Sequence, residues 1–145
     1  MKTLFICSAN VWRSQIAEWY YNKFTNTTDW ISSALIEDRR EKYNFSPTKE
    51  VIDLMVDDEV DITAQKIKLL TRSFCEESQS IILLLNPIDK LSEFEIEWKN
   101  AVSFLLDNYS KKLKILPIQD PFWEWIEKVY LIRNQIKDII KSLLN

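Results

Sequence analysis

A cysteine and an arginine near the N-terminus are the side chains best suited to covalent chemistry. Five residues separate Cys7 from Arg13. An apolar run precedes them, and a stretch of helical periodicity follows. A loop at the start of a helix directs several backbone N–H groups at an anion, and the helix dipole adds positive potential there. The spacing therefore predicts an oxyanion-binding loop made of Ser8, Ala9, Asn10, Val11, Trp12 and Arg13.

The two ends of this loop predict reactions at phosphate. The helix N-terminus would keep Cys7 as a thiolate at neutral pH, and the thiolate is the nucleophilic form of cysteine. Arg13 can bind two phosphate oxygens with its planar guanidinium, a geometry that lysine lacks. We therefore expect Cys7 to be a nucleophile and Arg13 to hold the phosphate. The alternative is that Cys7 is a core residue at the end of a strand, because free cysteines are usually buried.

Strand-like and helix-like segments alternate along the chain. The pattern predicts strands at residues 2–7, 30–35, 80–85 and 112–118. It predicts helices at residues 14–24, 46–58, 86–108 and 122–144. The second of these helices should begin with Ser46 as N-cap and Pro47 at its first position. The alternation predicts an α/β fold in one domain, residues 1–145, with a parallel sheet covered by helices on both faces.

One edge of such a sheet is the expected place for a ligand. Parallel α/β sheets bind ligands beyond the carboxyl ends of their strands. Cys7 ends the first predicted strand, and Asp120 follows the fourth. Both residues can therefore reach the same edge, although they are far apart in the sequence.

The composition argues against several other kinds of site. The chain has no histidine and only two cysteines, which leaves too few soft ligands for a zinc site. We expect neither a metal nor an organic cofactor. A net charge of −3 argues against nucleic-acid binding, which needs a basic surface. The apolar runs are far shorter than the roughly 20 residues of a membrane span, so we expect a cytoplasmic protein that does not bind membranes.

The chain also contains no glycine, the residue that normally occupies left-handed turns. Turns and helix ends must therefore use asparagine, aspartate and serine. In the predicted loop this role falls to Asn10, because asparagine tolerates left-handed backbone conformations.

Several motifs resemble those of one phosphatase family. Residues 4–24, LFICSANVWRSQIAEWYYNKF, resemble the opening of low-molecular-weight protein tyrosine phosphatases and of the arsenate reductases that share their fold. Ser33-Ala34 resembles the turn after the family's second strand, and Val60-Asp61-Ile62-Thr63 resembles its Ile-Asp-Ile-Ser segment. Asp120-Pro121-Phe122 resembles its Asp-Pro-aromatic loop. The resemblance covers essentially the whole chain and implies a four-stranded sheet in the order 2-1-3-4.

The resemblance also implies catalytic roles. Cys7 attacks phosphorus to form a phosphocysteine, and Asp120 protonates the departing oxygen and then activates water. Ser14 stabilises the thiolate by hydrogen bonding, and Asn10 orders the loop. Asp120 has a structural alternative as the N-cap of a helix that starts at Pro121.

Aromatic residues near Asp120 predict a rim that recognises an aromatic phosphate. Candidates are Trp123 and Phe122 beside the acid, with Tyr43 and Phe45 as the facing wall. Trp125 is a weaker candidate, because it can pack into the core at helical spacing. The expected substrates are a phosphorylated protein or a small aryl phosphate, with inorganic phosphate or another oxyanion as ligand. The polar run 37–42 is expected to be solvated, the alternative being that Arg39 or Arg40 guides a phosphorylated partner.

Departures from the family pattern leave other functions open. Ala9 replaces a glycine, Trp12 replaces a second cysteine, and Gln15 stands where phosphatases usually have proline. Arg-Ser-Gln is typical of the arsenate reductases, so one alternative is arsenate reduction by Cys7 with an external thiol. Cys75 precedes the third strand and should lie too far from Cys7 for a disulfide. The other alternative is a phosphate-binding module without catalysis.

Overall fold

The structure is a computed structural model, in which the predicted loop can be placed on its supporting elements. It describes residues 3–8, 10, 12–27, 32–35, 40–41, 44, 46–85, 95–96, 99–119 and 124–145.

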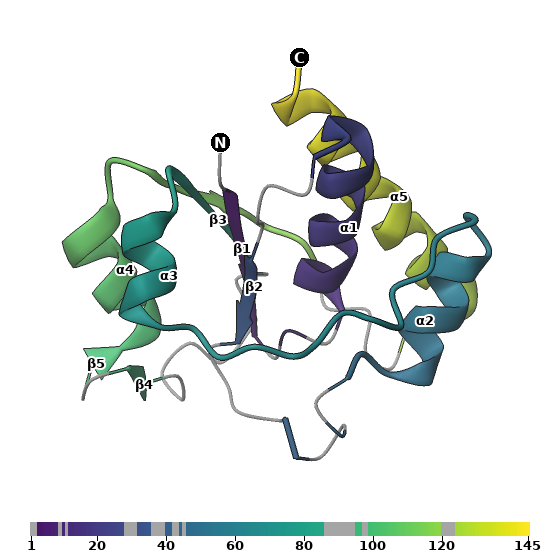
Figure 1. Cartoon of the computed structure of the whole chain (residues 1–145), viewed down its shortest axis with the longest axis horizontal. Helices are drawn as coiled ribbons and strands as arrows, with labels where there is room; N and C mark the ends of the chain where they lie inside the picture. The colour runs from purple at the N-terminus through teal and green to yellow at the C-terminus, as the bar shows by residue number, and fades with distance from the viewer. Residues whose placement is uncertain are drawn as a thin grey trace.

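A four-stranded parallel sheet forms the centre of the molecule (Figure 1). Its strands lie in the order β2-β1-β3-β6 and span Ser32–Leu35 (β2), Thr3–Cys7 (β1), Ser80–Leu84 (β3) and Leu113–Leu116 (β6). In the register, Leu4 of β1 lies opposite Ser32 on one side and Ile81 on the other. The predicted α/β class, the parallel sheet and its strand order are confirmed.

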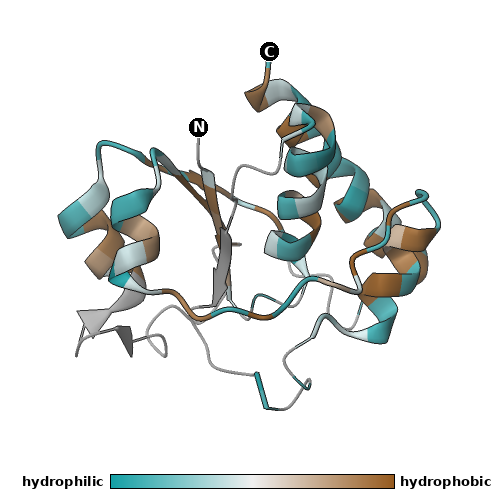
Figure 2. Ribbon diagram, viewed as in Figure 1, coloured by the Kyte–Doolittle hydropathy of each residue, from teal (hydrophilic) through white to brown (hydrophobic). Residues whose placement is uncertain are grey.

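The two central strands, β1 and β3, are buried on both faces, as their continuous apolar runs predict. Phe5 and Cys7 of β1 belong to one hydrophobic core, whereas Leu4 and Ile6 belong to the other. All four side chains are at most 2% exposed. Figure 2 shows β3 as a hydrophobic strand between helices of mixed hydropathy. The period-two alternation of β1 thus decides that the Cys7 side chain lies on the same face as the first core.

The helices cover the two faces of this sheet (Figure 1). The first core is covered by α1 (Arg13–Thr25), α2 (Lys49–Val56) and α5 (Ile126–Leu143). The second core is covered by α3 (Arg72–Glu77) and α4 (Ala101–Tyr109). The helix that follows the predicted loop, α1, therefore packs on the Cys7 face.

Among the described residues, no helix is both long and apolar enough to span a bilayer.

The predicted helix over residues 86–108 is confirmed from Ala101 onward but is wrong at residues 95–96 and 99–100. Residues Glu95–Ile96 (β4) and Lys99–Asn100 (β5) form a short antiparallel pair, and the helix begins only at Ala101. The sequence Phe94-Glu95-Ile96-Glu97-Trp98 alternates apolar and acidic residues, a period of two that suits a strand and not a helix. Residues 86–94 lie outside the described residues.

Two smaller differences concern helix boundaries. The predicted start at Ser46 and Pro47 is wrong, because Thr48 is the extended N-cap residue and α2 begins at Lys49. The extended backbone of Thr48 excludes Pro47 from the helix. The six-residue helix α3 was not predicted, since it is too short to show a periodic pattern.

Left-handed backbone conformations are carried mainly by asparagine, as the absence of glycine predicts. Positive φ angles occur at Asn10 (54°), Asn26 (50°), Asn44 (52°) and Glu59 (59°) in the described part of the chain. Asn26 is the C-cap of α1, a position where glycine is usual. Glu59 was not foreseen; it lies in the turn that follows α2.

A hydrogen-bonded cluster around Asp58 joins the end of α2 to α1 and α5. Tyr20 Oη donates to Asp58 Oδ2 at 2.6 Å, and Lys137 Nζ donates to the same oxygen at 2.8 Å. The bond from Lys137 is the main cause that lowers the pKa of Asp58, and the bond from Tyr20 adds to it. Burial and the contact with Asp58 raise the pKa of Tyr20. The charged form of Asp58 therefore stabilises the folded state.

Replacing Asp58 with asparagine is expected to lower the free energy of unfolding by about 1 kcal/mol at pH 7, since the carboxylate is partly exposed. The native pKa of Asp58 lies below its unfolded value of about 3.9. Its contribution is thus present above that pH and is lost as the pH falls through the native pKa. Urea unfolding at pH 7 and pH 3 should show a smaller difference at pH 3. Asp138→Asn, on the exposed side of α5, is the control, and an equal loss for Asp58→Asn at both pH values would contradict this explanation.

Candidate active site

Cys7 lies at the carboxyl end of β1 and faces the first turn of α1. Its side chain is buried, and its Sγ accepts a hydrogen bond from the backbone N–H of Ser14 at 3.4 Å. This N–H is one of those at a helix start that have no partner within the helix. Trp12, the N-cap residue, makes no side-chain capping bond, and the first turn contains no acidic residue. The positive end of the helix is therefore directed at the sulfur.

The direction of the hydrogen bonds around Cys7 is set by a distant part of the main chain. The backbone N–H of Lys68, which can only donate, lies 2.7 Å from Asn10 Oδ1. The amide nitrogen Nδ2 of Asn10 then donates to Ser14 Oγ at 2.7 Å. Ser14 Oγ accepts this bond and lies 3.0 Å from Cys7 Sγ, so its hydroxyl can donate to the sulfur when Cys7 is a thiolate. In that state Ser14 presents two donors to the sulfur, its hydroxyl and its backbone N–H.

Arg13 joins the loop to the chain that leads to the predicted acid. Its side chain is 1% exposed, so a charge is buried and depends on its hydrogen bonds. Nη1 donates to the carbonyl oxygen of Ile118 at 2.9 Å, and Nη2 donates to Ser8 Oγ at 3.4 Å. Ile118 follows β6 and precedes Asp120 by two residues. The loop and the chain that follows β6 therefore meet at this arginine.

Comparison with known proteins gives no match by sequence and many by structure. No protein-family model matches the chain, and no curated protein matches its sequence. A low-molecular-weight protein tyrosine phosphatase from T. tengcongensis is 17% identical, with a TM-score of 0.78 over 99% of this chain and 97% of that chain. The YwlE arginine phosphatase from Geobacillus stearothermophilus is 13% identical, with a TM-score of 0.72 over 98% and 89%. An arsenate reductase in the phosphate-binding state is 20% identical, with a TM-score of 0.73 over 98% and 95%.

The chain has the low-molecular-weight phosphatase fold. The resemblance inferred from its motifs is thereby confirmed at the level of the fold. The matched proteins include phosphatases named for two different substrates and a reductase, so this fold alone selects no activity. The choice among activities must come from the residues of the site.

The phosphatase fold brings part of the predicted site together at the end of β1. The described members are Cys7, Ser8, Asn10, Trp12, Arg13 and Ser14. The predicted residues that lie outside the described part of the chain are Ala9, Val11, Arg39, Tyr43, Phe45, Asp120, Phe122 and Trp123. Among the described residues, no group of three or more His, Cys, Asp or Glu side chains could hold a metal ion.

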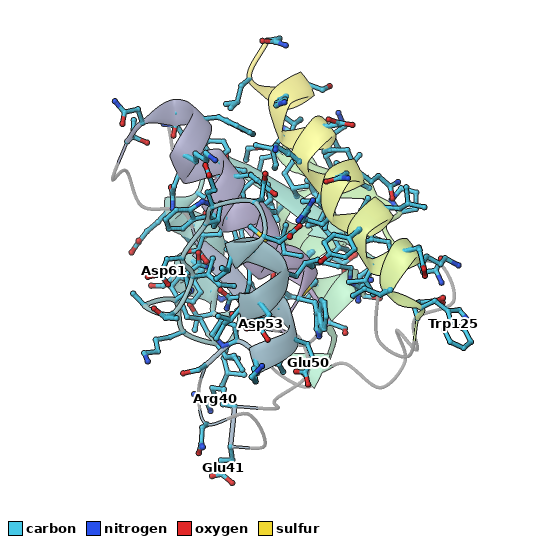
Figure 3. The ribbon with its side chains drawn as sticks, turned by 90° about the vertical axis from the view of Figure 1, so that its right-hand side faces the viewer. Arg40, Glu41, Glu50, Asp53, Asp61 and Trp125 are labelled. Atoms are coloured by element: carbon cyan, nitrogen blue, oxygen red, sulfur yellow. The ribbon has the colours of Figure 1, made fainter. Side chains whose placement is uncertain are left out.

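The alternative that Trp125 packs into the core is wrong. Trp125 is 83% exposed, and Figure 3 shows its ring projecting away from the body of the molecule. It is the N-cap of α5 and has an extended backbone, so it precedes the helical spacing that would place it in the core. Figure 3 places Trp125 at the right-hand edge of the view and Arg40 near the bottom, close to Glu41. The exposed indole therefore remains free for contact with a ligand or partner.

Cys75 lies on the other face of the sheet from Cys7. It is a buried residue of α3 in the second core, whereas Cys7 belongs to the first. Both cysteines are free thiols. Burial raises the pKa of Cys75 to about 11, which keeps it as a thiol at neutral pH. Cys75 is therefore poorly placed, and poorly ionised, for reaction with Cys7.

The sequence analysis did not identify a second layer of the site: Gln15, Gln65 and Lys68, whose hydrogen bonds hold the loop in place. Gln15 was noted only as a departure from the phosphatase pattern, and neither Gln65 nor Lys68 was singled out. In the structure all three are hydrogen-bonded to the loop or to each other. Gln65 lies 50 residues from its partner Gln15 in the sequence, and Lys68 lies 58 residues from its partner Asn10. No local spacing could therefore have indicated either contact.

Proposed function

We propose that this protein hydrolyses phosphate monoesters through a phosphocysteine intermediate and acts as a protein tyrosine phosphatase. The observation that carries the proposal is the sulfur of Cys7 at the start of α1, with Ser14 Oγ at 3.0 Å and the Ser14 N–H at 3.4 Å. A buried arginine, Arg13, belongs to the same loop. A helix start, an arginine and a hydrogen-bonded sulfur are the features that a thiolate needs to attack a bound dianion.

In the first step, the Cys7 thiolate attacks phosphorus while Arg13 and the loop hold the non-bridging oxygens. The S–P bond forms as the ester P–O bond breaks, and Asp120 gives its proton to the departing oxygen. The products of this step are the free alcohol or phenol, a phosphocysteine and an ionised Asp120.

In the second step, water attacks the phosphocysteine and the carboxylate of Asp120 takes up its proton. The S–P bond breaks, and its electron pair returns to sulfur. The two donors of Ser14 stabilise the thiolate as it forms, which makes it a better leaving group. Inorganic phosphate leaves, and the free enzyme is restored.

The proposal extends to the substrate and the place of action. Trp123, Phe122 and Tyr43 would form an aromatic rim for the ring of phosphotyrosine. The substrate is then a phosphorylated protein or a small aryl phosphate in the cytoplasm, and neither nucleic acid nor membrane is a partner. The exposed Trp125 beside α5 is an additional candidate for contact with the phosphorylated protein.

Arsenate reduction is the second candidate, favoured by Gln15 within the segment Arg13-Ser14-Gln15. A reductase must release the Cys7 adduct with another thiol. Cys75 lies across the sheet and has a raised pKa, so an external thiol would have to act. The arrangement of Ser14, which favours a thiolate leaving group, suits hydrolysis without any second thiol.

The deciding experiment compares three reactions of the purified protein: phosphate release from a phosphotyrosine peptide, phosphate release from phosphoarginine, and reduction of arsenate with glutathione. We expect hydrolysis of the phosphotyrosine peptide to be fastest. Cys75→Ser should hydrolyse it at the parent rate, because Cys75 is confined to the second core. Arsenate reduction without phosphatase activity would overturn the proposal, and faster hydrolysis of phosphoarginine would change its substrate.

A further inference from the structure

The side-chain amide of Gln15 is buried next to the phosphate loop and forms hydrogen bonds with it. It lies in the first turn of α1 and is 0% exposed. Its Nε2 donates to the carbonyl oxygen of Asn10 at 2.9 Å, to Asn10 Oδ1 at 3.2 Å and to the carbonyl oxygen of Lys66 at 3.0 Å. Two of these acceptors are backbone carbonyls, so the side that faces them must be the NH2 group. The orientation of the Gln15 amide is therefore fixed by the main chain.

A second glutamine holds the first. Gln65 Nε2 donates to the backbone carbonyl of Gln15 at 3.1 Å and also to its side-chain oxygen, Oε1. The side-chain oxygen of Gln65, Oε1, is buried and has no hydrogen-bond partner among the described residues. Gln65 thus donates to two oxygens of Gln15, and Gln15 in turn donates to Asn10 of the loop.

The residue that receives this support is the one with the unusual backbone. Asn10 has a φ of 54°, a left-handed conformation that asparagine tolerates at some cost and that its hydrogen bonds help to hold. Gln15 binds both oxygens of Asn10, the backbone carbonyl and Oδ1, and the Lys68 N–H binds Oδ1 as well. In this orientation Asn10 Nδ2 faces Ser14 Oγ. The position of Ser14 Oγ beside Cys7 Sγ therefore depends on Gln15 through Asn10.

We propose that Gln15, held by Gln65, is a positioning residue that keeps Asn10 left-handed and so keeps the loop in its oxyanion-binding shape. The proposal rests on the proposed function, because it assigns these amides to the same site. It makes residues 65–68 part of the machinery that holds the loop, although none of them touches the substrate.

The test uses Gln15→Met and Gln65→Met, which keep an unbranched chain of similar length and remove the donors. Vanadate affinity is measured by calorimetry, with kcat and KM for phenyl phosphate and the thermal midpoint measured in parallel. We expect Gln15→Met to weaken vanadate binding about tenfold and Gln65→Met about threefold, well below the unfolding temperature. Gln135→Met, on the exposed side of α5, is the matched control and should bind vanadate like the parent.

The Gln15→Glu variant separates positioning from simple loss of stability. Its carboxylate has no donor for the three acceptors, whereas the protonated acid regains one. The ratio of parent to variant vanadate affinity should therefore fall as the pH is lowered. A role confined to stability would leave vanadate affinity at the parent value in every folded variant.

Each outcome bears on the inference. A folded Gln15→Met variant with parent affinity overturns it; if that variant does not fold, parent affinity in Gln65→Met overturns it. A parent that binds vanadate but hydrolyses no phosphate ester refutes the proposed function, while the affinities of the variants still decide this inference. A parent that binds neither vanadate nor phosphate overturns both.

Discussion

Replacing Cys7 with serine is expected to abolish turnover while leaving phosphate binding almost intact. A serine hydroxyl stays protonated at neutral pH and is a much weaker nucleophile than the thiolate that it replaces. We expect kcat for para-nitrophenyl phosphate to fall at least about a thousandfold. The vanadate dissociation constant, measured by calorimetry, should stay within about threefold of the parent, because Arg13 and the loop remain.

The matching variant at the other end of the loop should behave differently. Arg13→Ala should lose turnover and vanadate binding together, because it removes the guanidinium that binds the anion and the bond to the Ile118 carbonyl. Lys114→Ala, an exposed cation on β6, controls for a general loss of positive charge. Substantial hydrolysis by Cys7→Ser would show that the reaction is not covalent at Cys7.

Much of the scaffold of this site could be predicted because the signals that specify it are local. β1 and β3 are apolar runs whose side chains pack alternately into the two cores, and such runs indicate strands buried on both faces. The spacing from Cys7 to Arg13 reflects one turn between a strand and a helix, so it is visible in a few consecutive residues. The left-handed Asn10 was predicted for the same reason, since a chain without glycine has few residues able to take that conformation.

The second layer of the site could not be predicted because its contacts are tertiary. Gln15 lies beside the loop in sequence, yet the direction of its amide is set by Lys66 and Gln65, about fifty residues away. An amide can donate or accept equally well, so its role depends on which backbone groups face it. The sequence shows that glutamine is present but not which of its atoms faces the loop.

The wrong helix before Ala101 has a different cause. A proline after Asn86 and apolar residues downstream suggested one long helix, while the alternation in residues 93–98 favoured a strand. The structure follows the two-residue alternation and forms a strand pair, in which Glu95 pairs with Asn100 and Ile96 with Lys99. The site is unaffected, because this pair lies near α4 and away from the Cys7 face (Figure 1).

The position of the chain before Asp120 gives the strongest support for a test of the proposed acid. Ile118, two residues earlier, is buried in the same core as Cys7 and accepts a bond from Arg13. Two residues of extended chain reach roughly 7 Å at most. We therefore choose Asp120 as the acid to test, because the described chain two residues before it contacts Arg13 of the loop.

Replacing Asp120 with asparagine is expected to slow phenyl phosphate about a hundredfold or more and para-nitrophenyl phosphate less than about tenfold. The nitrophenolate anion leaves readily without a proton, whereas phenolate needs one, so the loss should grow with the pKa of the leaving group. Initial rates on a series of substituted phenyl phosphates measure this dependence as the slope of log kcat/KM against that pKa. Asp61→Asn, an exposed aspartate whose bonds are to Thr63, should keep the parent slope. An equal loss on every ester would instead assign Asp120 to the N-terminal cap of the following segment, and the proton donor would have to be sought elsewhere.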